Sequence, residues 1–147
     1  MPISTDERIA ILQDIQREWL ALARAVRDLS DNDLGHGELA NGWTIKVTMG
    51  HVTAWERKLI DEVRHGERGE AFTWPHMDVF NPQRAALDAR RPASEIREDF
   101  WRTHDELIQL LETTPILSRE LVESDTYTHY PNHTTQIMEW RKRSRSG

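Results

Sequence analysis

The stretch Gly42–Val63, GWTIKVTMGHVTAWERKLIDEV, decides the fold of this chain. On a helix that turns about 100° per residue, its aliphatic side chains fall on one arc, formed by Ile45, Met49, Val52, Leu59, Ile60 and Val63. Two ionisable residues interrupt the pattern. Glu56 lies near the middle of the arc, and His51 lies at its edge, on the same flank as Trp55 one turn further on. The stretch therefore predicts an amphipathic helix whose inner face carries a histidine and a carboxylate.

A second stretch near the C-terminus, His129-Tyr-Pro-Asn-His133, places two more histidines where apolar residues are expected. They are one helical turn apart, and their stripe continues through Ile137 and Trp140. Together with His51 they supply three neutral imidazoles from two helices, which is the donor set of a catalytic divalent metal with one position left open. The alternative is that these histidines are hydrogen-bonded core residues.

The chain before Gly42 predicts one more long helix followed by a loop. Ser4 is the expected N-cap, and an apolar stripe with helical period continues to about Leu29. Residues 30–42 are rich in turn formers and predict a loop in which His36 is a solvated residue.

The later start and stop signals predict three more helices. The expected helices run from a Thr44 cap to about His65, from a Ser94 cap to Thr113, and from about Thr128 to about Arg143. Between the second and third helices, residues 67–92 form a long crossover that could act as a lid, with Asn81-Pro82 as the start signal of a short helix. Without any strand pattern, the chain predicts an all-α four-helix bundle, one domain over residues 1–147, with a frayed basic tail at 144–147.

Composition narrows the possible partners and compartments. The formal net charge is -6, so no nucleic-acid backbone or acidic lipid is an expected partner. The chain has no cysteine, no signal-peptide pattern at its start and no apolar run of membrane-spanning length. We therefore expect a cytoplasmic protein with no membrane association, which binds a small molecule.

Several short motifs, in order along most of the chain, resemble the DinB/YfiT-like superfamily. They are Gly42-Trp43-Thr44 followed by His51, Ala54-Trp55-Glu56, Asp78-Val-Phe-Asn81 and Asp125-Thr-Tyr-Thr-His129-Tyr-Pro-Asn-His133. Within this superfamily the chain is most similar to the ClbS/DfsB-like branch. The resemblance implies an up-down-down-up four-helix bundle, dimeric in many members, with a pocket at one end.

The resemblance also implies a metal centre and a range of chemistries. By position, His51, His129 and His133 would bind zinc or nickel. Similar proteins include thiol transferases that use bacillithiol or mycothiol, a maleylpyruvate isomerase, and a resistance protein that opens a cyclopropane in a genotoxin. Pro131 departs from the helix formers usual between the two late histidines and could tilt His129 out of register.

The residues themselves favour Lewis-acid chemistry over other classes. No glutamate follows His129, which excludes an H-E-x-x-H peptidase, and nucleophile elbows and phosphate loops are missing from the sequence. A bound metal could lower the pKa of water or of a low-molecular-weight thiol cosubstrate. Glu56 is the candidate catalytic acid or base; the alternative is a buried partner for Arg8 or Arg27.

The remaining candidates are Trp55, Asn81 and Tyr130, as substrate-binding residues, although Asn81 could be only a helix cap. Two functions from different classes follow. One is a metal-dependent hydrolase or thiol transferase that detoxifies small reactive molecules. The other is a noncatalytic bundle that binds a small molecule or dimerises.

Overall fold

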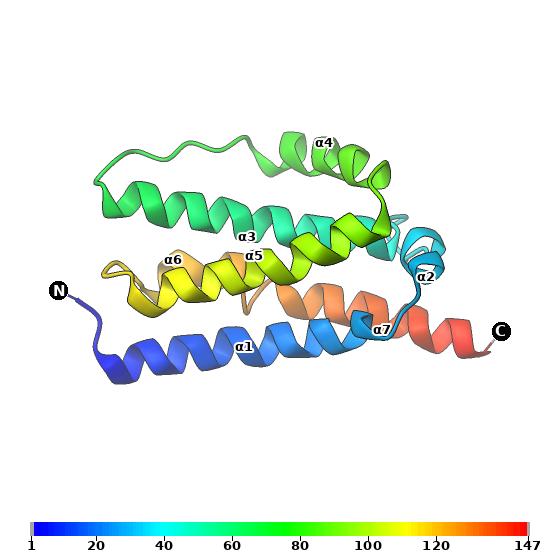
Figure 1. Cartoon of the computed structure of the whole chain (residues 1–147), viewed down its shortest axis with the longest axis horizontal. Helices are drawn as coiled ribbons and strands as arrows, with labels where there is room; N and C mark the ends of the chain where they lie inside the picture. Colours follow the sequence, from blue (N-terminus) through cyan, green and yellow to red (C-terminus); the bar gives the residue numbers. More distant parts are fainter. Residues whose placement is uncertain (1, 147) are drawn as a thin grey trace.

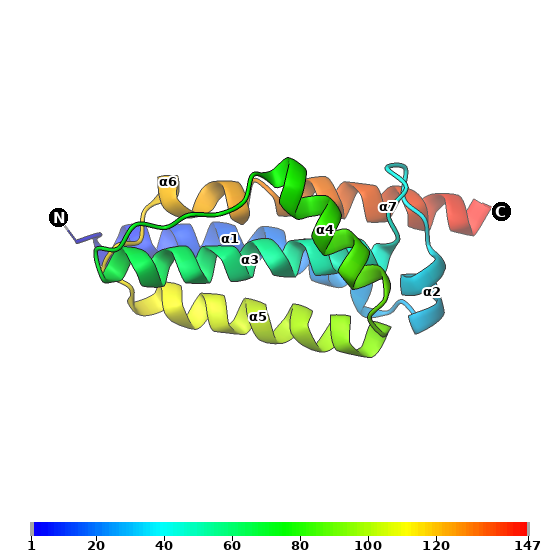
Figure 2. The same ribbon diagram turned by 90° about the horizontal axis from the view of Figure 1, so that it is seen from above.

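Four long helices form the body of the structure, a computed structural model that describes residues 2–146. They are α1 (Thr5–Arg27), α3 (Ile45–Glu67), α5 (Ala93–Thr113) and α7 (Tyr130–Ser146). In Figures 1 and 2, α1 and α7 run in one direction, and α3 and α5 run in the other. The predicted all-α, up-down-down-up bundle is confirmed, and the described residues contain no β-strand.

The helices pack in two parallel pairs, α1 beside α7 and α3 beside α5. The apolar stripes that the sequence predicts on α1, α3 and α5 meet in one core cluster. Its fully buried members include Ile11, Ile15, Leu22, Met49, Leu59, Ile60, Phe100, Leu107 and Leu111. The helices pack around this core because burial of the stripes removes apolar surface from water, which stabilises the bundle.

The predicted N-caps of α1 and α3 are confirmed. Ser4 accepts the Glu7 N–H at 3.1 Å, and Thr44 accepts the Val47 N–H at 3.1 Å. The predicted Ser94 cap is wrong: Pro92 holds the N-cap position of α5, with an extended backbone and no side-chain hydrogen bond.

Three short elements escaped the sequence reading. The predicted loop at 30–42 contains α2 (Asp31–His36), which opens with a capping box between Ser30 and Asp33 and ends at the exposed His36. Before α7 come α6 (Arg119–Val122) and the 3-10 turn η1 (Glu123–Asp125). Helices this short carry too few apolar positions to show a period.

The crossover contains a longer helix than predicted. The helix α4 (Met77–Ala89) begins before the Asn81-Pro82 signal, because His76 Nδ1 accepts the Asp78 N–H at 3.1 Å and caps the helix there. Asn81 is therefore not the N-cap. Figure 2 shows α4 lying across α3 after an extended segment.

The C-terminal helix differs from prediction at both ends. It begins at Tyr130, not near Thr128, and continues to Ser146, so residues 144–146 of the predicted tail are helical and Gly147 lies outside the described residues.

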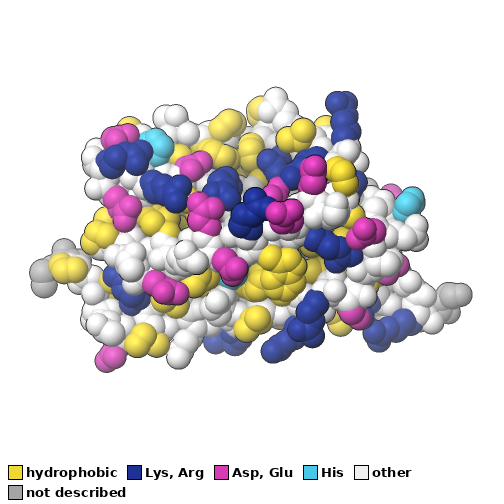
Figure 3. Space-filling view, in the orientation of Figure 1, with side chains coloured by type: hydrophobic (Ala, Val, Ile, Leu, Met, Phe, Trp, Pro, Cys, Tyr) yellow, Lys and Arg dark blue, Asp and Glu magenta, His cyan; other side chains and the backbone are white. Residues whose placement is uncertain are grey.

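The surface carries acidic and basic side chains side by side. On the face in Figure 3 the two signs are interspersed with apolar patches. None of the helices in the described part of the chain combines the length and the apolar character needed to span a bilayer.

Candidate metal centre

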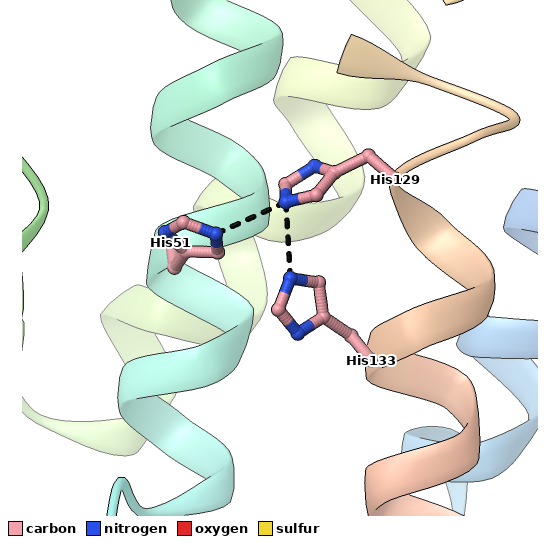
Figure 4. A group of neighbouring side chains, drawn as sticks. All are labelled: His51, His129 and His133. Carbon is pink, nitrogen blue, oxygen red and sulfur yellow. Dashed lines mark hydrogen bonds between the residues drawn. The ribbon is translucent and has the colours of Figure 1, made fainter. Parts of the chain in front are cut away.

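The three predicted ligand histidines come together at the seam between α3 and the start of α7. The Nε2 atom of His129 lies 3.0 Å from Nε2 of His51 and 3.0 Å from Nε2 of His133. One ligand atom from each residue lies within 4.8 Å of the other two. In Figure 4 the His51 ring extends from α3 toward the other two rings, and the dashed lines mark the two contacts. The geometry is that of a group able to hold one metal ion.

The local backbone explains how His129 reaches this point. It is the residue before α7, and its N–H donates to the Thr126 carbonyl at 2.8 Å, as does the N–H of Tyr130 at 2.9 Å. Pro131 is the second residue of α7, where a missing N–H costs no helical hydrogen bond. His129 and His133 therefore converge from a turn and a helix, rather than from one continuous helix.

Hydrogen bonding favours a cation between the rings. His133 Nδ1 lies 3.0 Å from Gln136 Oε1, so Nδ1 carries the proton and the Nε2 lone pair faces the site. If His129 Nε2 carries a proton, it can donate that proton fully to His51 or to His133 but not to both, so one of the two 3.0 Å contacts lacks a full hydrogen bond. The Nδ1 atoms of His51 and His129 are buried without a partner. A metal at the common point would use all three Nε2 lone pairs, so the residues fit a divalent ion such as zinc.

The electrostatics of the site keep the rings in the form that binds metal. Burial, together with the neighbouring histidines, lowers the pKa of His51 to about 3. Burial and the nearby His133 lower the pKa of His129 to about 3, and burial also lowers that of His133. All three imidazoles are thus neutral near pH 7, as ligation requires.

A pocket of about 250 Å³ opens beside His51 and His129. Two predicted substrate-binding residues form part of its wall, and the Trp55 indole N–H donates to Asn81 Oδ1 at 2.9 Å, which joins α3 to α4. The sequence reading missed three lining residues, Met77, Ser124 and Asp125. Two of them had a signal: Asp125 opens the motif that ends at His133, and Met77 is an apolar residue of the crossover that the sequence predicts as a lid.

Asp125 brings a buried carboxylate to this pocket. It is 6 % exposed, and burial raises its pKa although Lys58 lies 3.1 Å from its Oδ2. Lys58 also contacts Glu62 at 3.0 Å and lies 5.6 Å from the Trp55 ring centre. The carboxylate can therefore receive a proton from a ligand in the pocket more readily than a solvated aspartate could.

Glu56 and Tyr130 lie in the core and not among the residues that line this pocket. The Tyr130 hydroxyl donates to Glu56 Oε2 at 2.7 Å, and His104 Nδ1 lies 2.6 Å from the same oxygen. Burial, and then the adjacent Glu56, raises the pKa of Tyr130 well above its usual value, so the hydroxyl remains a donor.

The arginine partners considered for Glu56 are not its hydrogen-bond partners. Arg8 instead donates to the carbonyls of Leu111 and Thr114, at 2.7 and 2.8 Å. Arg27 is exposed at the end of α1. His104 takes that place beside the carboxylate, from a position inside the apolar arc of α5.

Comparison with known proteins identifies the family. A family model described as the mycothiol maleylpyruvate isomerase N-terminal domain matches residues 15–119, which is more than two thirds of the chain. The match includes His51 and ends before His129 and His133. Searches of curated proteins and of solved structures found no match. The chain belongs to the mycothiol maleylpyruvate isomerase N-terminal domain family, a helical family of DinB/YfiT-like type.

Proposed function

We propose that this protein is a divalent-metal-dependent enzyme that acts on small reactive molecules, as a hydrolase or a thiol S-transferase in detoxification or resistance. The observation that carries the proposal is the convergence of the Nε2 atoms of His51, His129 and His133 at the edge of a pocket. A zinc or nickel ion held by these atoms would act as a Lewis acid toward a bound water or thiol.

The family description supports the thiol branch of this proposal, since it names a mycothiol-dependent isomerase. We assign to this chain a low-molecular-weight thiol as cosubstrate, a cytoplasmic location, membership of the ClbS/DfsB-like branch and a homodimeric state. The sequence motifs that resemble the ClbS/DfsB-like branch favour membership of it. The sequence contains no cysteine that could serve as an internal thiol, which favours an external thiol as cosubstrate.

In this proposal, some residues of the pocket bind the substrate and one accepts a proton. Trp55 and Met77 offer an apolar surface, and Asn81, whose Oδ1 is taken by Trp55, presents its amide N–H groups for a ligand. Asp125 is the proton acceptor for an incoming thiol or water, because its carboxylate borders the pocket. Glu56, which the sequence suggests for this role, has its Oε2 engaged by two side chains in the core.

Metal analysis of untagged protein tests the proposal. After exposure to zinc or nickel and removal of excess ion, we expect about one equivalent per chain, as a three-histidine site requires. A content below about a tenth of an equivalent, on the same stoichiometric reasoning, would refute the metal-dependent function.

An activity assay separates the enzyme from the alternative of a noncatalytic binding or dimerising bundle. Zinc- or nickel-loaded protein is mixed with a small thiol and monochlorobimane, an electrophile that fluoresces on conjugation. Conjugation faster than that of a His51→Ala variant supports the transferase, and the matched assay with an activated ester supports the hydrolase. Metal binding without either rate enhancement supports the binding bundle.

A further inference from the structure

A layer of four polar side chains crosses the core, one from each long helix. Gln16 comes from α1, Glu56 from α3, His104 from α5 and Tyr130 from α7. His104 Nε2 lies 2.6 Å from Gln16 Oε1, and its Nδ1 lies 2.6 Å from Glu56 Oε2. The Tyr130 hydroxyl donates to that same Glu56 oxygen at 2.7 Å. The four residues thus form one continuous chain of hydrogen bonds.

Three members of this layer are shielded from solvent, whereas Gln16 is only partly buried. Glu56 and Tyr130 are fully buried, and His104 is almost so. The His104 ring stacks on Trp19 with ring centres 3.8 Å apart and planes 4° from parallel, which fixes its orientation. Glu56 Oε1 is buried without a partner, so the carboxylate depends on Tyr130 and His104. Loss of a hydrogen bond here leaves a buried polar atom that water cannot satisfy.

The layer crosses the same helix seam as the candidate metal ligands. Tyr130 follows His129 directly, and Glu56 lies on α3 between one and two turns after His51. His129 is outside the regular part of α7 and is held there by its N–H bond to the Thr126 carbonyl. The side chain of the next residue therefore anchors the turn that carries this ligand.

We propose that Glu56 and Tyr130 are a positioning pair that holds the start of α7 against α3 and thereby sets the metal affinity of the His51, His129 and His133 site. The inference rests on the proposed function only in requiring that this site binds a divalent metal. Neither residue is a ligand, and neither lines the pocket.

The effect on affinity follows from preorganisation. With the Tyr130 hydroxyl bonded to Glu56, the His129 ring is held within 3.0 Å of His51 before metal arrives. Without that bond, the turn samples other positions, and part of the binding free energy is spent on ordering it. Loss of a direct hydrogen-bond partner of a metal ligand lowers metal affinity by roughly 10- to 100-fold. Tyr130 acts on His129 through the backbone, so we expect the lower end of that range, about tenfold.

Tyr130→Phe tests the inference, because it removes one hydroxyl and leaves the ring in place. The matched control is Tyr127→Phe, three residues earlier in the chain, whose hydroxyl contacts Arg119 and Glu123 at 3.3 Å near the surface. Zinc dissociation constants are measured on the full chain by competition with a chromophoric chelator at 10 °C. We expect roughly tenfold weaker zinc binding for Tyr130→Phe and less than a twofold change for Tyr127→Phe.

A double-mutant cycle separates positioning from general destabilisation. Glu56→Gln removes the negative charge from the oxygen that accepts from both Tyr130 and His104. Hydrogen bonds to a neutral amide oxygen are weaker than those to a carboxylate, so this variant should also weaken zinc binding. If Tyr130 acts through Glu56, the double variant binds zinc no more weakly than the worse single variant. A purely structural role would lower the melting temperature of both variants and leave the zinc dissociation constant of the folded protein unchanged, and this result would overturn the inference.

The remaining outcomes are also decisive. Circular dichroism verifies that each variant is folded at 10 °C, and if Tyr130→Phe is not, Glu56→Gln decides by the same criterion. If the unmodified protein binds neither zinc nor nickel, the proposed function fails. The positioning role is then judged from the imidazole resonances of His51 and His129 in metal-free protein. These resonances should move in Tyr130→Phe and not in Tyr127→Phe, and equal spectra would refute the role.

Discussion

The carboxylate of Asp88 in α4 lies directly against the α-carbon of Gly50 in α3, so that a Cβ at position 50 would overlap it. Asp88 is fully buried and held by Arg84 at 2.9 Å and Arg91 at 3.2 Å. The cross-over helix therefore meets the bundle where α3 has no side chain. Because α4 also carries Met77 and Asn81, this contact positions one wall of the pocket.

Gly50→Ala should destabilise the protein by about 1–3 kcal/mol, since the new methyl group overpacks the contact and Asp88 cannot move without losing its ion pairs. Denaturant unfolding measures this change. The cost should be smaller in an Asp88→Ala background, where the space is free. An equal cost in both backgrounds would mean that the overlap with Asp88 is not the cause.

His133→Ala should abolish the stabilisation of the protein by zinc. A metal that binds only the folded state raises its stability by about 2.7 kcal/mol at a free concentration one hundred times the dissociation constant. Melting temperatures with zinc and with chelator should differ for the unmodified protein and coincide for the variant. His36→Ala, at an exposed position in α2, is the control and should keep the full shift. A zinc shift that survives in His133→Ala would place the metal elsewhere.

Asn81→Leu should loosen α4 over the pocket, because it removes the acceptor of the Trp55 indole N–H. One lost hydrogen bond of this kind costs roughly 1 kcal/mol, which corresponds to about a fivefold rise in local opening. Hydrogen exchange of the amides of residues 77–89 reports that opening. Asn81→Asp keeps the acceptor oxygen and should exchange like the unmodified protein. Unchanged exchange in Asn81→Leu would show that other contacts hold the helix.

Metal-free protein should lose stability as the pH falls below about 6.5, the ordinary histidine pKa. In the folded state His51 and His129 have a pKa of about 3. Between pH 6.5 and pH 3 these two residues are therefore protonated in the unfolded chain and neutral in the folded one, which favours unfolding. Their contribution is complete above pH 6.5 and is lost progressively toward pH 3. Denaturant unfolding in chelator at pH 7.5 and 5.0 measures it. A His51→Gln, His129→Gln double variant should show a smaller fall, and an equal fall would assign the acid sensitivity to other groups.

Periodicity was sufficient to predict the four long helices, because each buries one apolar stripe in the common core, but it did not fix every helix end. It was insufficient for the start of α4. Asn81-Pro82 has the residue types of a helix start, yet the His76 ring supplies a cap earlier in the chain. Histidine is a rare cap, so residue preferences alone favour the wrong boundary.

The sequence indicated which residues point inward but not which of them pair. His51, His129 and His133 stand out because each replaces an apolar residue on a predicted inner face. The pairing of Glu56 with His104 and Tyr130 spans 48 and 74 residues, and it depends on how the helices are turned about their axes. Local patterns contain no information on that rotation, and the two arginines considered as partners of Glu56 do not contact it.

The histidine cluster combines residues that are far apart in the chain, which has a consequence for biosynthesis. His51 is synthesised 78 residues before His129, so a nascent chain still on the ribosome presents a lone imidazole where the finished protein has three. Under the proposed function, metal acquisition must therefore await synthesis of His129 and His133.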